Sequence, residues 1–272
     1  MVVEPANLSM RVQQRLASGL TISQDFRTSV RFPVFETGFE EWPIATNGGT
    51  LFLVTVRGRV FGLTCRHVLK GFEWRQLRVT EAKIGKMFAP IRGLVYPSAP
   101  RGEAVETDIL DIAVVEFAPE VGATFFPDPP YILDADTSGS ANIGDVLWVH
   151  GTLKEKSDLS EMPISPQFCF LEFGDQGAAS ADPTLRRGFA GFADPEFSEI
   201  TGLSGSPVFD LTTKKLVGMV VRGALDNRTC TVWYIDMFDI LKFVTAVAEG
   251  RDNTNYTKVV IRLTRKVITD QP

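Results

Sequence analysis

The chain has 272 residues, of which 44% are hydrophobic, and this length and composition suit a folded protein with a sizeable core. The 28 Lys and Arg residues against 33 Asp and Glu give a net charge of −5, and no basic tract indicates a nucleic-acid or anionic-lipid partner. No run approaches the ~18 apolar residues of a membrane span, and Glu4 and Pro5 interrupt the start where a secretory signal needs an apolar stretch.

The three cysteines are widely spaced and odd in number: Cys65, Cys169 and Cys230. This pattern fits neither a disulfide framework nor a zinc site with paired ligands. We therefore expect no metal and no other cofactor. A reducing compartment, the cytoplasm, is the simplest location for such a chain.

Residues 7–19 carry apolar side chains at helical spacing, which predicts a short helix within an N-terminal extension over residues 1–47. Short strand patterns follow from residue 50 onward. The first two, at 50–56 and 59–64, flank Arg57-Gly58, a tight hairpin signal. Many short strands separated by turn residues indicate an all-β sandwich or barrel.

A stretch rich in Pro, Asp, Gly and Ser over residues 118–145 separates two strand-rich parts of similar length, and residues 126–145 are the expected linker. From Asp236, which can cap a helix, apolar residues follow helical spacing until Gly250. We predict a helix there. The run after it, within the C-terminal extension 251–272, reads as one more strand.

Ser204 lies between glycines in "GLSGSPVFD", a pattern that suits a nucleophile but also an ordinary turn. A serine nucleophile needs a base, and the two histidines, His67 and His150, both precede it. This order excludes the α/β-hydrolase arrangement, in which the histidine follows the serine. A subtilisin-type order would need Asp25, which lies in a polar segment without strand pattern. The order His, Asp, Ser remains.

Asp111 interrupts the apolar run "ILDIAVVEF", where a carboxylate is costly unless it accepts hydrogen bonds. It could instead lie in a loop or bulge, and His67 could be a core histidine bonded to a backbone carbonyl. A carboxylate that holds one imidazole nitrogen, and leaves the other to take the serine proton, accounts for both residues. Asp108 is the fallback for the carboxylate, and we give His150 no role.

Three blocks of the sequence resemble the His, Asp and Ser blocks of trypsin-like (chymotrypsin-fold) serine peptidases, most nearly the bacterial-type branch without disulfides. They are "GTLFLVTVRGRVFGLTCRHVL", "DIAVVEF" and "GLSGSPVFDLTTKKLVGMVVRG", and the likeness spans about residues 48–249. It implies an all-β fold of two six-stranded antiparallel β-barrels with the two helices appended. The first barrel would cover 48–125, and the second, with the closing helix, 146–250.

The resemblance also implies a catalytic triad of His67, Asp111 and Ser204 in the cleft between the barrels. The backbone N–H groups of Gly202 and Ser204 would form the oxyanion hole. Further residues would contact the substrate: Val221, Arg222 and Gly223 through its backbone, and Ser198 at the position that often sets the preferred side chain.

Leu203 stands where zymogen-activated members of that family carry an aspartate that pairs with a new N-terminus, so we expect a site that forms without such cleavage or with the help of a regulatory protein partner. The expected function is a serine endopeptidase that cleaves a protein or peptide substrate through an acyl-enzyme on Ser204. The alternatives are a catalytically silent peptide-binding or scaffold module, and an esterase or other acyl hydrolase on the same fold.

Overall fold

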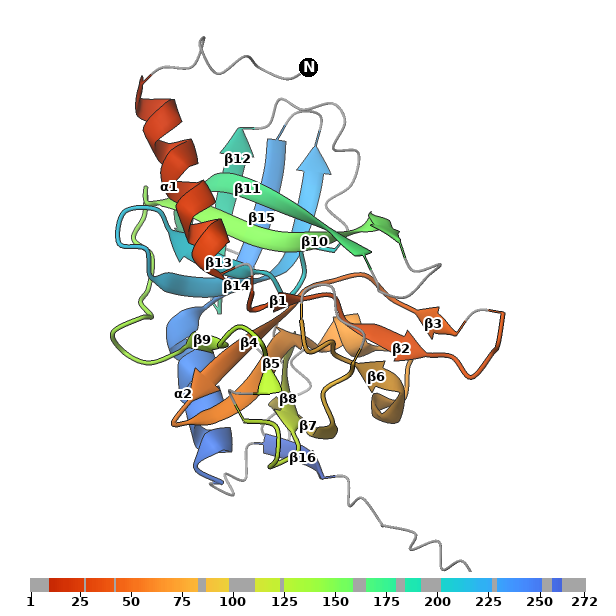
Figure 1. The fold of residues 1–272 in the computed structure, drawn as a ribbon. Helices are drawn as coiled ribbons and strands as arrows, with labels where there is room; N and C mark the ends of the chain where they lie inside the picture. Colours follow the sequence, from red (N-terminus) through yellow and green to blue (C-terminus); the bar gives the residue numbers. More distant parts are fainter. Residues whose placement is uncertain are drawn as a thin grey trace, which may run out of the picture.

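The computed structural model describes residues 10–26, 28–41, 43–82, 87–97, 111–122, 125–158, 165–179, 184–191, 202–226, 229–250 and 256–260. Two β-structured halves lie one above the other, with one helix against each (Figure 1). This arrangement confirms the expected all-β class with a chymotrypsin-like double barrel and two helices. Within the described part, neither helix is long and apolar enough to cross a membrane.

The second half closes into a barrel of six strands in the order β10-β11-β12-β15-β14-β13, with antiparallel neighbours. Its strands are β10 (Val146–Asp158), β11 (Ser165–Ala178), β12 (Leu185–Gly191), β13 (Pro207–Asp210), β14 (Leu216–Asp226) and β15 (Thr229–Asp236). Leu147, Val149 and Val208 belong to the buried cluster of this half.

The first half divides its strands between two sheets. One sheet has the order β1-β4-β5-β8-β7-β16, with β9 paired to β4, and the other has the order β3-β2-β6. The strands are β1 (Val30–Arg31), β2 (Val34–Glu36), β3 (Ile44–Ala45), β4 (Leu51–Val56), β5 (Arg59–Cys65), β6 (Leu77–Arg78), β7 (Ile91–Pro97), β8 (Ile112–Phe117), β9 (Tyr131–Ile132) and β16 (Tyr256–Val260). Two short 3-10 helices, η2 (Arg66–Leu69) and η3 (Trp74–Gln76), follow β5.

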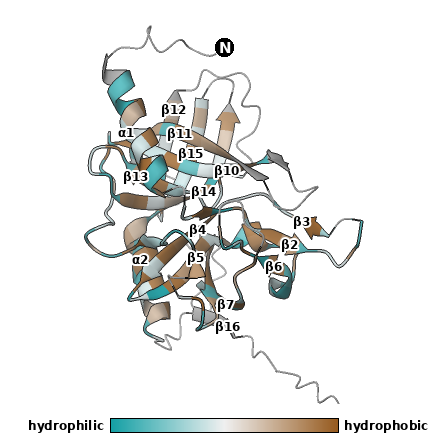
Figure 2. Cartoon of the chain, in the orientation of Figure 1, coloured by the Kyte–Doolittle hydropathy of each residue, from teal (hydrophilic) through white to brown (hydrophobic). Residues whose placement is uncertain are grey.

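The hairpin between β4 and β5 forms as expected, because Arg57 and Gly58 both take positive φ, 49° and 75°, as a tight two-residue turn requires. Both strands are almost wholly buried. Figure 2 shows the hydrophobic residues that follow these two strands through the lower half. The hairpin therefore forms part of the first-half core and carries the chain directly to η2.

The N-terminal helix α1 (Met10–Phe26) extends beyond the expected end at residue 19. Its last turns continue the apolar face, since Ile22 and Phe26 are 4% and 1% exposed. The Phe26 ring lies 4.7 Å from the rings of both Tyr131 and Phe209, which come from different halves. Packing against both halves thus carries the helix beyond the segment that periodicity predicted.

The closing helix α2 (Met237–Ala248) begins where the sequence predicted, and the Asp236 side chain accepts the Phe238 N–H at 2.9 Å. Its apolar side, including Ile240 and Val244, is fully buried. After it, β16 adds to the edge of β7 as an antiparallel strand. The rest of the expected C-terminal strand lies outside the described residues.

Candidate active site

Strand register places His67 and Asp111 side by side. β5 and β8 pair through five residues, ending with Cys65 opposite Ile112. His67 lies on η2, two residues after Cys65, and Asp111 directly precedes Ile112. Two residues far apart in the sequence therefore meet because the ladder between the two strands fixes where each strand ends.

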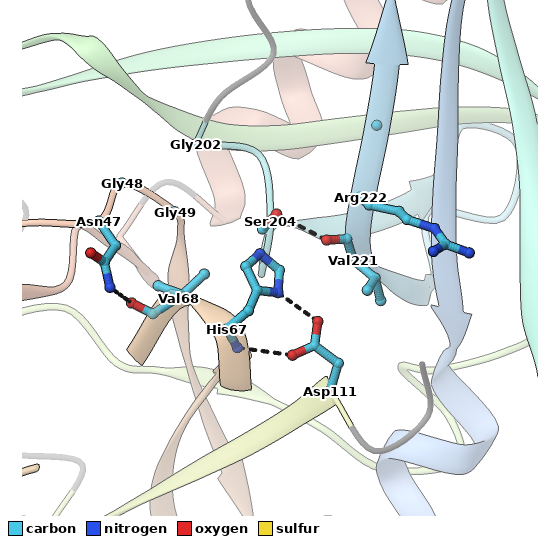
Figure 3. A pocket seen from close by; sticks show the side chains of 11 residues that line it. Asn47, Gly48, Gly49, His67, Val68, Asp111, Gly202, Ser204, Val221 and Arg222 are labelled. Carbon is cyan, nitrogen blue, oxygen red and sulfur yellow. Dashed lines mark hydrogen bonds and ion pairs between the residues drawn. The ribbon is translucent and has the colours of Figure 1, made fainter. Parts of the chain in front are cut away.

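Both carboxylate oxygens of Asp111 accept hydrogen bonds from His67. Oδ2 lies 2.5 Å from Nδ1, and Oδ1 lies 2.9 Å from the backbone nitrogen. A carboxylate accepts, so Nδ1 carries the proton and the second ring nitrogen of the neutral imidazole keeps its lone pair. That nitrogen faces Ser204 (Figure 3), and the His67 side chain is 46% exposed against 18% for Asp111. The imidazole is thus oriented as a base open to the pocket.

Ser204 lies on a turn that only glycines can build. Gly202 and Gly205, on either side of it, take φ of 115° and 87°. A Cβ on Gly205 would overlap the carbonyl oxygen of Thr50, and one on Gly202 would overlap the carbonyl oxygen of Thr152. The glycines therefore allow the turn to press against backbone from both halves, and leave the serine half-buried at the pocket.

The Ser204 hydroxyl donates to the carbonyl oxygen of Val221 at 2.9 Å. Among the described residues, no hydrogen bond joins this hydroxyl to His67. Val221 belongs to β14, at the register irregularity between Val220 and Arg222. The base and the serine share one pocket, but the hydroxyl must rotate about its Cα–Cβ bond before His67 can take its proton.

These residues line a pocket of about 500 Å³, within the range of ligand sites. The β14 segment expected to contact substrate, Val221 to Gly223, forms part of its wall. The Arg222 side chain points away from His67 (Figure 3), and its guanidinium lies 5.4 Å from the centre of the Trp233 ring. Ser198 and the fallback Asp108 lie outside the described residues.

Gly202 and Ser204, whose amides are expected to form the oxyanion hole, both line the pocket. Within the described residues, the N–H groups of Gly202 and Ser204 donate to no other protein group. Leu203 between them is 4% exposed and belongs to the buried cluster of the second half. Apolar packing of Leu203 thus anchors this turn, at the position where no aspartate is present to bind an N-terminus.

Sequence reasoning missed Asn47, Gly48 and Gly49, which form another wall of the pocket. The Asn47 side-chain amide donates to the carbonyl oxygens of Val68, at 3.0 Å, and Lys70, at 2.6 Å. It therefore ties the loop before β4 to the 3-10 helix that carries His67. The signal was the Asn-Gly-Gly run, a turn pattern directly before a strand.

Cys65, His67 and Asp111 place potential metal-ligand atoms within 4.8 Å of one another. The His67–Asp111 bond of 2.5 Å is too short for an ion between the two residues, because each Zn–N or Zn–O bond alone takes about 2.0–2.2 Å. Cys65 is fully buried and its thiol donates to the carbonyl of Val220 at 3.2 Å. The group is therefore explained by strand register and hydrogen bonding.

The other candidate side chains of the sequence lie in the core. His150 is 1% exposed and packs between the rings of Phe168 and Phe170, at 5.5 and 4.9 Å. Burial raises the pKa of the Cys169 thiol to about 12, so this thiol stays protonated near neutral pH. Neither His150 nor Cys169 is among the residues that line the pocket with Ser204 and His67.

No protein-family model matches the sequence, and no curated protein matches it. Among solved structures, an inactivated protease paralogue of the scabies mite superposes with a TM-score of 0.52 at 15% identity, covering 85% of this chain and 98% of that one. The MamO protease domain from Magnetospirillum magneticum covers 80% of this chain and 97% of that one, with a TM-score of 0.46 at 11% identity. At these identities the likeness to the scabies mite protein establishes the fold: the chain has a trypsin-like protease fold.

Proposed function

We propose that this protein is a serine endopeptidase with Ser204 as nucleophile, His67 as general base and acid, and Asp111 as the residue that orients it. The observation that carries the proposal is the pair of hydrogen bonds that His67 donates to Asp111, which turns the second imidazole nitrogen toward Ser204. A histidine held this way can accept a serine proton and later return it to the leaving group.

The reaction would begin when the Ser204 hydroxyl turns from Val221 toward His67. Ser204 Oγ attacks the carbonyl carbon as His67 accepts the proton, and the oxygen of the tetrahedral intermediate lies against the N–H groups of Gly202 and Ser204. His67 then protonates the leaving amine, and an acyl-enzyme remains on Ser204. Water, deprotonated by His67, releases the acid and restores the serine.

An edge of β14 supports a peptide as the substrate. β13 pairs with β14 from Leu216 to Met219, and the strand ladders of the described part of the chain place no strand on that side of β14 beyond Met219. An extended peptide can add there as a further strand. Its N–H would then compete with Ser204 for the Val221 carbonyl, and would release the hydroxyl for attack.

A non-catalytic peptide-binding module is the second candidate. The Ser204 hydroxyl bonds to Val221 rather than to His67, and one similar fold belongs to a protein named as an inactivated protease paralogue. The two candidates share the β14 edge and differ in whether Ser204 reacts. A third candidate, an esterase, would react at Ser204 but leave peptides intact.

A fluorophosphonate probe separates these candidates, because it phosphonylates a serine only when a base activates it. We expect mass spectrometry to locate the adduct on Ser204 in the full chain under reducing conditions, and Ser204→Ala to abolish it. Cleavage of a peptide library then separates a peptidase from an esterase tested on p-nitrophenyl acetate. A chain that binds peptides but takes no probe would be the peptide-binding module.

We also propose that the protein works in a reducing compartment such as the cytoplasm. Cys65, Cys169 and Cys230 are all buried thiols with no disulfide between them. The enzyme should therefore keep its labelling rate in excess dithiothreitol. A labelling rate that rises on addition of cell extract would indicate a regulatory protein partner. Such a partner is an alternative to zymogen activation, for which the aspartate is replaced by Leu203.

A further inference from the structure

Thr50 lies at the junction of the two halves, directly before β4, and is 0% exposed. Its backbone N–H donates to the carbonyl oxygen of Ser204 at 2.8 Å. Its own carbonyl oxygen accepts the Thr64 hydroxyl at 2.7 Å, so the backbone at Thr50 is fixed to the first half. One residue of the first half therefore touches the backbone of the nucleophile in the second.

The Thr50 hydroxyl contacts the Thr152 hydroxyl and three further groups. Oγ1 lies 2.9 Å from the backbone nitrogen of Thr152, 3.0 Å from the hydroxyl of Ser206 and 3.0 Å from the carbonyl oxygen of Gly202. An amide can only donate and a carbonyl can only accept, so among these three contacts it is the Gly202 carbonyl that receives the single Thr50 hydroxyl proton. Its two lone pairs then accept from Thr152 and Ser206, which satisfies the group completely.

The third hydroxyl of the cluster is consistent with this assignment. Thr152 Oγ1 lies 3.1 Å from Thr50 Oγ1 and donates its own proton to the carbonyl oxygen of Gly49 at 2.8 Å. With that proton committed, Thr152 Oγ1 can only accept from Thr50, and the Gly202 carbonyl oxygen, at 3.0 Å against 3.1 Å, is the nearer acceptor for the Thr50 proton. A valine of the same shape could not make this bond.

These hydrogen bonds restrict the backbone on both sides of Ser204. Three successive carbonyls are held: Gly202 by the Thr50 hydroxyl, Leu203 by the N–H of Ser206 at 2.9 Å, and Ser204 by the N–H of Thr50. The N–H of a peptide points opposite to its carbonyl, so the Leu203 carbonyl sets the direction of the Ser204 N–H. Thr50 holds the carbonyls before and after that peptide.

We propose that the Thr50 hydroxyl is a positioning residue for catalysis, which fixes the turn that presents the oxyanion donors and does not itself touch the substrate. The inference rests on the proposed function, because it assigns the turn to transition-state stabilisation. An oxyanion donor is worth about 10²–10³ in kcat, and its value depends on a position fixed before the reaction. Loss of the Thr50 hydroxyl should cost part of this factor.

The test compares Thr50→Val with wild type in three measurements: fluorophosphonate labelling rate, kcat and KM on p-nitrophenyl acetate, and the ¹⁵N shift of the Ser204 amide. We expect labelling and kcat to fall about 10- to 100-fold with KM nearly unchanged, since the loss concerns the transition state. Thr50→Ser keeps the hydroxyl and should restore most of the rate. Thr50→Ala is measured in parallel, in case valine prevents folding.

Two control variants separate positioning from general loss of a buried bond. Thr55→Val changes a threonine of β4 whose side chain makes no hydrogen bond within the described residues, and Ser206→Ala removes one bond at Thr50 but keeps the bond to Gly202. Both should label at close to the wild-type rate. Equal losses in Ser206→Ala and Thr50→Val would overturn the positioning role.

The failure of the inference differs from the failure of the proposed function. If wild type takes the probe on Ser204 and Thr50→Val and Thr50→Ala label equally fast, the function stands and the inference is wrong. If wild type takes no probe, the proposed function fails, and the amide shift still decides the inference. A Ser204 ¹⁵N signal that stays in place in both variants would show that Thr50 does not position this peptide.

Discussion

The two halves hold their parts of the pocket by different means. In the first half, a strand ladder of five residue pairs ends beside His67 and Asp111, which are already hydrogen-bonded at 2.5 Å. In the second half, Ser204 lies on a turn held by single hydrogen bonds, and its hydroxyl bonds to Val221. On the proposed function, the base would already be assembled before a substrate binds, whereas the Ser204 hydroxyl would still have to turn toward it. Substrate binding at β14 is therefore the step that should complete the site.

The largest effect is expected from Ser204→Ala, which removes the reactive hydroxyl that the second half supplies under the proposed function. Loss of a triad serine reduces kcat by roughly 10⁶ in serine peptidases, and the fold should be unaffected because one half-buried hydroxyl contributes little to the core. Peptide hydrolysis measures the loss of kcat, and thermal unfolding measures whether the fold is unaffected. Wild-type turnover in this variant would place the nucleophile elsewhere.

Asp111→Asn tests the first half and should lower kcat by about 10⁴. The asparagine oxygen can still accept the backbone N–H of His67, but its amide nitrogen donates to Nδ1. The proton then moves to Nε2, and the imidazole can no longer accept from Ser204. Rates are measured at pH 7 to 8 with a peptide substrate. Asp111→Glu, which keeps the charge, should retain more activity, and equal loss in both would show that the tautomer is not the cause.

Gly205→Ala should break the turn while leaving the strand ladder intact. The new Cβ would meet the Thr50 carbonyl oxygen, and alanine at φ of 87° carries a strain of about 1–2 kcal/mol in addition. Gly58→Ala is the matched control, because φ is 75° there but nothing lies within 4 Å of the added atom. Urea unfolding should show a clearly larger loss for Gly205→Ala. Equal losses would mean that the turn yields to the side chain.

The sequence predicted those features that local patterns determine. The Arg57-Gly58 hairpin and the Asp236 cap depend on a few neighbouring residues, and the order of His67, Asp111 and Ser204 left one arrangement of chemistry to consider. The meeting of His67 and Asp111 was expected from a costly carboxylate in an apolar run. The short distance between His67 and Asp111 is set by the register of β5 and β8, and it could not be read from the spacing of the two residues along the chain.

What the sequence did not predict depends on contacts between the halves. Thr50 is one threonine among many until the turn of Ser204 comes against it, and the bond from Ser204 to Val221 requires the irregularity in β14. The short strand β9 forms inside the expected linker because β4 offers it a parallel edge. The helix α1 likewise extends to Phe26 because that ring finds partners in both halves.

The smallest expected effect is a pH dependence of the free energy of unfolding, caused by Cys169 in the core of the second half. Its thiol is buried, whereas His67 in the first half is exposed to the pocket. Burial raises the pKa of the Cys169 thiol from an ordinary 9.0 to about 12. Below pH 9 the thiol is neutral in both states and adds no pH dependence. Between pH 9 and 12 the unfolded chain loses the proton and the folded chain keeps it, so the free energy of unfolding falls as pH rises.

At pH 10 this difference amounts to about 1.4 kcal/mol relative to pH 8, one pKa unit being worth about 1.4 kcal/mol. Urea unfolding at pH 8, 9 and 10 under reducing conditions should show the decline in wild type. Cys169→Ala shifts all three values by a constant packing loss, but its decline should be smaller by about 1.4 kcal/mol, because alanine has no proton to lose. An identical slope in the variant would mean that Cys169 ionises as readily in the folded barrel as in the unfolded chain, and that the second half opens to solvent more easily than its closed ring of six strands implies.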